Sequence, residues 1–148
     1  MAGGTFLYLS RADVERVNVS MRETIEALEQ MFKEKGEGRV EMPPKPGIHP
    51  RQDAFIHAMP AYIPSMESAG IKWVSGYPQN KDKALPYITG LLILNDPETG
   101  IPTAVMDCTA ESYTTAGAGG TTSGFSVLGS SSKTQATDEL GQEARRPG

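Results

Sequence analysis

Lys72 is the residue of this sequence whose type and position most suggest chemistry, because it interrupts an apolar strand pattern in AGIKWVSG, residues 69–76. Side chains alternate between the two faces of a strand, so Lys72 shares a face with Val74 and lies opposite to Trp73. If that face is inward, the ammonium needs an anion, and Lys72 becomes a carboxylate anchor or a proton donor. The strand pattern alone favours the alternative, in which Lys72 points to solvent from a half-buried strand.

A second candidate cation is Lys45, in the segment MPPKPGIHP. The prolines on both sides restrict the backbone to extended conformations, so the segment is expected to form a stiff loop. Such a loop can hold a positive charge at a fixed point. The ordinary interpretation, a solvated loop lysine, stays open beside it.

The chain has two histidines, His49 and His57. Asp53 and Asp107 are not spaced in the sequence so as to form a recognisable set of metal ligands with them. A structural or catalytic metal needs three or four converging ligands, so no metal site is predicted. We expect His57 to lie on a sheet face with one hydrogen bond. The single cysteine, Cys108, is expected to be a small core residue.

The positions of these residues depend on two predicted helices near the N-terminus. Ser10, with Asp13 three residues later, is expected to cap a short helix, and Ser20 with Glu23 forms a fuller capping box. The second helix is expected to end at Gly36. Its apolar positions have helical spacing and predict one buried face, made of Met21, Ile25, Leu28 and Phe32.

The rest of the first 109 residues is strand-like. The predicted strands cover residues 6–9, 39–42, 54–59, 70–75, 87–95 and 101–108, with a turn at 95–100. A strand, two helices and then a run of strands predict an α+β fold: a mostly antiparallel sheet with helices on one face.

Composition divides the chain after Thr109. Residues 110–148 are rich in glycine, serine and threonine and contain few large apolar side chains. So few buried groups do not offset an ordering cost of about 1–2 kcal/mol per residue. We therefore predict a domain over residues 1–109 and a flexible, disordered tail over 110–148, without a Rossmann domain.

Charge and cysteine content exclude some classes of function. The formal net charge of −4 argues against nucleic-acid binding, which needs a basic surface. No apolar run is long enough to cross a membrane. One cysteine and no N-terminal signal pattern predict a cytoplasmic protein.

Four segments resemble the N-terminal half of the ornithine cyclodeaminase/mu-crystallin family: PPKPGIHP, HAMPAYIP, AGIKWVSGYPQNK and LPYITGLLILNDPETGIPTAVMD. The resemblance covers about residues 5–109. It implies a domain that binds substrate and forms a homodimer, followed in the family by a Rossmann domain that binds NAD or NADP. Family members include ornithine and lysine cyclodeaminases, alanine dehydrogenases and ketimine reductases.

The resemblance also implies roles for particular residues. Lys72 matches the family lysine that contacts the substrate carboxylate and assists proton transfer, and Lys45 falls where the family has a carboxylate-binding arginine. Met59 is implied as a further substrate-binding residue. Tyr87 takes the place of a residue that touches the nicotinamide amide, and Thr115 that of a second substrate-binding arginine.

These implications predict a truncated substrate-binding and dimerisation half of an amino-acid or imino-acid enzyme. It is expected to be inactive alone and to bind no cofactor by itself, since the cofactor domain and its acidic residue are expected to be missing. A small amino-acid or cyclic imino-acid ligand is expected, with a homodimer or a mixed dimer with a full-length relative. A non-catalytic ligand-binding or dimerisation module and an unstable fragment are the alternatives.

Overall fold

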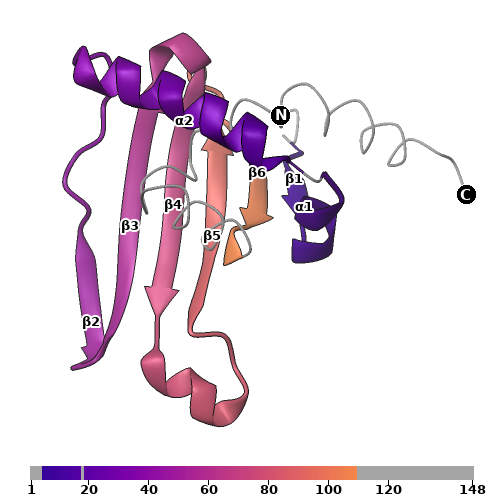
Figure 1. Ribbon diagram of the computed structural model, residues 1–148, viewed down its shortest axis with the longest axis vertical. Coiled ribbons are helices and arrows are strands. Elements are labelled where there is room, and N and C mark those ends of the chain that lie inside the picture. The colour runs from indigo at the N-terminus through magenta and orange to yellow at the C-terminus, as the bar shows by residue number, and fades with distance from the viewer. Residues whose placement is uncertain (1–4, 18, 110–148) are drawn as a thin grey trace, which may run out of the picture.

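A computed structural model describes residues 5–17 and 19–109, which form one sheet with two helices (Figure 1). The helices are α1 (Arg11–Val17) and α2 (Met21–Gly36). The strands are β1 (Leu7–Leu9), β2 (Gly47–Arg51), β3 (Ala54–Ile63), β4 (Ser68–Gly76), β5 (Ile88–Asn95) and β6 (Pro102–Asp107). Two 3-10 turns, η1 (Pro64–Met66) and η2 (Pro78–Lys83), flank β4.

The six strands lie in the order β1-β6-β5-β4-β3-β2. Every neighbouring pair is antiparallel except β1 and β6, which are parallel. Helix α2 lies across one end of the sheet (Figure 1). The predicted α+β class, with a mostly antiparallel sheet, is confirmed.

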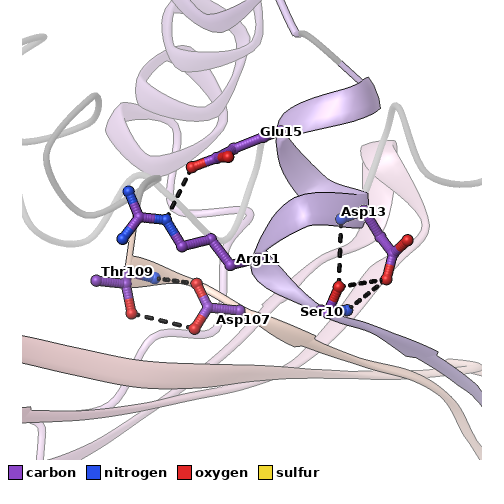
Figure 2. Close-up of polar contacts among 6 residues, drawn as sticks. All are labelled: Ser10, Arg11, Asp13, Glu15, Asp107 and Thr109. Carbon is purple, nitrogen blue, oxygen red and sulfur yellow. Dashed lines mark hydrogen bonds and ion pairs between the residues drawn. The ribbon is translucent and has the colours of Figure 1, made fainter.

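Both predicted helix caps form. The Ser20 amide donates to the Glu23 carboxylate at 2.8 Å, and the Glu23 amide donates back to Ser20 Oγ at 3.3 Å. Ser10 and Asp13 make the same reciprocal pair at the start of α1, with the Ser10 amide 2.9 Å from the Asp13 carboxylate (Figure 2). Such pairs satisfy amides that a helix start leaves without partners.

The buried face of α2 differs from the predicted one. Leu28 is buried as expected, but Met21, Ile25 and Phe32 are exposed. Thr24, Met31 and Glu34 are buried instead. The apolar pattern missed this rotation because two of the buried residues are polar: Thr24 Oγ1 donates to the Ser20 carbonyl at 3.1 Å, and the Glu34 carboxylate has an arginine partner.

The core lies between the helices and one face of the sheet, called here the helix-side face. Leu28 and Met31 of α2 pack with Leu9, Leu92 and Ile63 of that face. Cys108 belongs to the same core and is fully buried, as predicted. The opposite face, called here the open face, keeps large apolar residues exposed, including Trp73 and Leu91.

One strand prediction and one loop prediction near residue 45 were wrong. Residues 39–42 contribute only an isolated bridge, between Glu41 and Tyr62. The segment expected to be a loop contains β2, a fully exposed edge strand that includes Pro50. Proline is tolerated at a sheet edge, where its missing N–H removes no ladder bond.

An ion pair joins the end of α2 to the segment after it. The Arg39 guanidinium donates two hydrogen bonds of 2.8 Å to Glu34. These bonds lower the pKa of Glu34 below its ordinary value of 4.5.

We expect Glu34→Gln to lower the melting temperature at pH 7 and to make no difference in strong acid. A carboxylate with a lowered native pKa stabilises the fold fully above its unfolded pKa, and this contribution disappears as the pH falls through the native value. Thermal melts of both proteins from pH 7 down into strong acid, below the native pKa of Glu34, measure the effect. The same difference in melting temperature at both ends of that range would contradict it.

Residues 110–148, predicted to form a flexible tail, lie outside the described residues. Within the described part of the chain, neither helix is both long enough and apolar enough to cross a membrane.

Candidate functional site

Lys72 lies in the middle of a row of side chains that crosses the helix-side face. The register pairs Lys72 with Met59 on β3 and with Leu92 on β5. Leu92 pairs in turn with Met106, and Met106 with Leu9. Lys72 is thus the only charged residue among these five, and the side chains on either side of it are apolar.

The Lys72 side chain is buried, with 4% of its surface exposed, so the solvent-facing alternative is excluded. Trp73, on the other face, is 46% exposed, as the alternation predicts. Strands β2, β3, β4 and β5 contain no aspartate or glutamate. No salt bridge or side-chain hydrogen bond joins Lys72 to another described residue. A buried cation without an anion is costly, so the arrangement favours binding of an anionic group from outside.

Lys45 extends the same row beyond β3. The Ala58 amide donates to the Pro46 carbonyl at 3.0 Å, which continues the β2–β3 pairing and sets Lys45 beside Met59. Two strand spacings put the backbones of Lys45 and Lys72 about 10 Å apart. Lys45 is exposed. Two long side chains on either side of Met59 are able to reach one carboxylate.

His57 lies next to this row, two residues before Met59 and opposite Val74. Partial burial, with the charges of Lys45 and His49 adding to it, lowers the pKa of His57 below its ordinary value of 6.5. The imidazole is therefore uncharged at neutral pH. The hydrogen bond predicted for His57 does not form with any described residue.

Tyr87 is placed apart from the two lysines. It precedes β5, five residues before Leu92 in the Lys72 row, and is 47% exposed. Its carbonyl accepts from the Tyr77 amide at 2.9 Å. Thr115, the other position implied by the resemblance, lies outside the described residues.

The described residues do not by themselves fit a nicotinamide cofactor. They contain no strand–helix–strand unit with a glycine-rich phosphate loop, the arrangement that holds a dinucleotide. Within the same residues, no group of three or more histidine, cysteine or acidic side chains is placed to hold a metal ion.

A polar hollow of about 480 Å³ lies elsewhere, lined by Arg51, Gln52, Asp53 and Gln79. Arg51 donates to Gln79 Oε1 across it at 2.7 Å. It lies at the turn between β2 and β3. The first residue of β3 is five residues before Met59, so the hollow is separate from the row that contains Lys45, Met59 and Lys72, called here the lysine row. Arg51 also forms an ion pair with Asp53, so the charges of the hollow are matched within it and we assign it no role.

The last described residues, at the end of β6, are held by hydrogen bonds between near neighbours in sequence. Asp107 accepts a hydrogen bond of 3.0 Å from the Thr109 amide and one of 3.1 Å from its hydroxyl (Figure 2). Asp107 thus has a local structural partner in Thr109.

Comparison with known proteins identifies the family. The model of the ornithine cyclodeaminase/mu-crystallin family matches residues 6–133. This chain belongs to that family. The match runs past Thr109, the predicted end of the domain, and that boundary stays a prediction.

Among curated relatives, this chain is similar to the nodulation efficiency protein NfeD of Rhizobium meliloti. The two are 50% identical over 100 residues, and the match covers 68% of this chain and 31% of NfeD. Among solved structures this chain is similar to an archaeal alanine dehydrogenase dimer with bound NAD: 42% identity, TM-score 0.71, 76% of this chain and 34% of that one. It is also similar to a Thermococcus litoralis Δ1-pyrroline-2-carboxylate reductase in complex with NADH and L-proline: 38% identity, TM-score 0.72, 76% of this chain and 35% of that one.

The chain thus spans about a third of the length of the curated relatives it matches. Sequence reasoning named Lys45, Lys72 and Met59, which the structure places in one row, and their role in binding stays a prediction. It placed His57 on a sheet face but gave this residue no role beside the lysines. The only signal was that His57 precedes Met59 by two residues and so shares its face.

Proposed function

We propose that this chain forms the substrate-binding half of an NAD(P)-dependent amino-acid or imino-acid oxidoreductase or cyclodeaminase. The observation that carries the proposal is Lys72: a lysine side chain only 4% exposed, between Met59 and Leu92, with no carboxylate partner among the described residues. A ligand carboxylate supplies the missing anion and converts a costly buried charge into a buried ion pair.

In this proposal each residue of the row contacts a different part of the ligand or adds a separate charge. Lys72 binds the carboxylate from the floor of the site and holds a proton near the α-carbon substituents. Lys45 adds a second positive charge from the rim, as a point charge rather than a bidentate fork. Met59, between them, gives the carbon skeleton of the ligand an apolar contact.

NAD or NADP, as bound in the family, would supply the hydride in a complete enzyme, with Tyr87 facing the nicotinamide. Holding both reactants together is what makes such a transfer fast. We propose that the 148-residue chain, tested as such, binds ligand without turnover, in a cytoplasmic setting.

The test is to titrate the 148-residue chain with L-proline by calorimetry, and to follow NADH absorbance with Δ1-pyrroline-2-carboxylate in parallel. We expect saturable binding of L-proline and no oxidation of NADH. Absence of binding would contradict the ligand site. Turnover of NADH would contradict the proposal that the chain is inactive alone.

Self-association is a second candidate function, favoured by the open face of the sheet. Tyr8, Ile71, Ile93 and Val105 form one paired row across that face, and Trp73 pairs with Leu91 beside them. We name these six residues the open-face patch. Large apolar patches left in water mark interaction surfaces, and the similar alanine dehydrogenase is a dimer.

We propose that the open-face patch pairs with a second copy of the chain, or with an intact relative in a mixed dimer. Sedimentation velocity at micromolar concentration is the test. A clean monomer would contradict self-association, and broad melting with strong binding of a hydrophobic dye would favour an unstable fragment instead.

A further inference from the structure

The imidazole of His57 packs closely against its neighbours. It stacks on Phe55 with ring centroids 4.4 Å apart and meets His49 edge-on at 6.2 Å. A Cβ added to Gly47 would lie 2.2 Å from His57 Cδ2, so the ring packs directly on the backbone of β2. Glycine at 47 thus makes room for this ring.

The ring nitrogens of His57 are nevertheless unused within the described structure. No hydrogen bond joins either nitrogen to another described residue. A neutral imidazole offers one donor and one acceptor. A polar group that is fixed in place and keeps its hydrogen-bonding capacity is suited to an incoming ligand.

An amino-acid ligand brings a positively charged nitrogen as well as a carboxylate. The lysine row suits the carboxylate but repels the nitrogen, and strands β2 to β5 have no acid to receive it. On the helix-side face of β3, β4 and β5, the polar side chains are Lys72, His57 and Ser68, and Ser68 lies under the core, 3% exposed. His57 is therefore the neutral acceptor nearest to the lysine row.

We propose that His57 accepts a hydrogen bond from the protonated amine or iminium nitrogen of the ligand, while Lys72 and Lys45 bind its carboxylate. This inference rests on the proposed carboxylate site and adds the requirement for a ligand nitrogen. His57 thereby selects α-amino and cyclic imino acids over carboxylates of the same shape that lack the N–H.

The preference for a ligand nitrogen is expected to depend on pH, because His57 itself takes up a proton in acid. Lys45 and His49 approach from the β2 side and Lys72 from the neighbouring strand β4, and none of them is negative. When His57 takes up a proton, it loses its acceptor and repels the ligand nitrogen. The preference for a nitrogen is then lost as the pH falls through the pKa of His57, which lies below 6.5.

The experiment compares two ligands of matched shape, L-proline and (S)-tetrahydrofuran-2-carboxylate, in which an ether oxygen replaces the ring nitrogen. Calorimetric titrations use the full 148-residue chain as wild type, His57→Leu and His57→Gln. A hydrogen bond to a charged group predicts that wild type at pH 7 prefers L-proline about tenfold. His57→Leu is expected to lose that preference and keep its affinity for the ether. His57→Gln, which retains a neutral acceptor, is expected to restore part of the preference.

The outcomes separate the inference from the proposed function. Equal affinity of wild type for both ligands, or an unchanged preference in His57→Leu, would overturn the role of His57 and leave the carboxylate site standing. An equal loss of both ligands in His57→Leu would assign His57 a structural role and also overturn the inference. Wild type that binds neither ligand would overturn the carboxylate site and the role of His57 together.

Discussion

Lys72→Met is expected to weaken carboxylate binding strongly and, at the same time, to raise the melting temperature of the chain. The two effects have one cause, which is that Lys72 is buried between Met59 and Leu92 without an anion from the described residues. Methionine fills a similar volume and removes the cost of a buried charge, which is worth about 1 kcal/mol or more. Loss of a buried charged partner is expected to weaken L-proline binding about 100-fold or more.

Calorimetry with L-proline and thermal melting measure the two effects on the same samples. Lys83→Met is the matched control, because Lys83 is exposed in η2 and away from the row. It is expected to change neither property. A Lys72→Met protein that melts at a lower temperature would show that the ammonium is structural in the free chain.

Trp73→Lys is expected to weaken self-association about 100-fold or more. Trp73 lies in the open-face patch and is 46% exposed in the single chain, so the substitution removes little packing within it. In a dimer through this face, tryptophan at the centre is the residue type that contributes most to affinity, and a lysine there would be buried without a partner.

Phe32→Lys is the control for this substitution. Phe32 is 45% exposed, close to Trp73 in that respect, but it lies on α2, on the helix side of the sheet. Sedimentation at increasing concentration is expected to give a monomer for Trp73→Lys and a dimer for Phe32→Lys and wild type. If Phe32→Lys dissociates the dimer and Trp73→Lys does not, the contact surface lies on the helix side.

Local sequence patterns predicted the parts of the fold that depend on neighbours in sequence. The capping box of Ser20 and Glu23, and the alternation of Lys72 with Trp73, both have this character. The rotation of α2 could not be deduced from its apolar residues, because Thr24 and Glu34 bury polar groups whose hydrogen bonds make burial acceptable.

The candidate site was predictable only in part, for a similar reason. The resemblance named Lys45, Met59 and Lys72, and the strand pattern left the direction of Lys72 open. Its neighbours come from the strands paired on both sides, which the pattern of one strand does not reveal. The surroundings of His57 depend on β2. The prolines of that segment predict a loop, whereas the structure forms a strand there because it lies at the sheet edge, where proline is tolerated.

The parallel pairing of β1 with β6 has a consequence for how the molecule is made on the ribosome. Strands β2 to β5 pair with their neighbours in sequence order, so this part of the sheet can assemble as each strand emerges. The first strand has no partner until almost all the described residues have been synthesised, because it pairs only with the last one. Leu9 and Met106 meet in that pairing and continue the Lys72 row. We therefore expect the row to be completed late, in a slow step set by contact between distant parts of the chain.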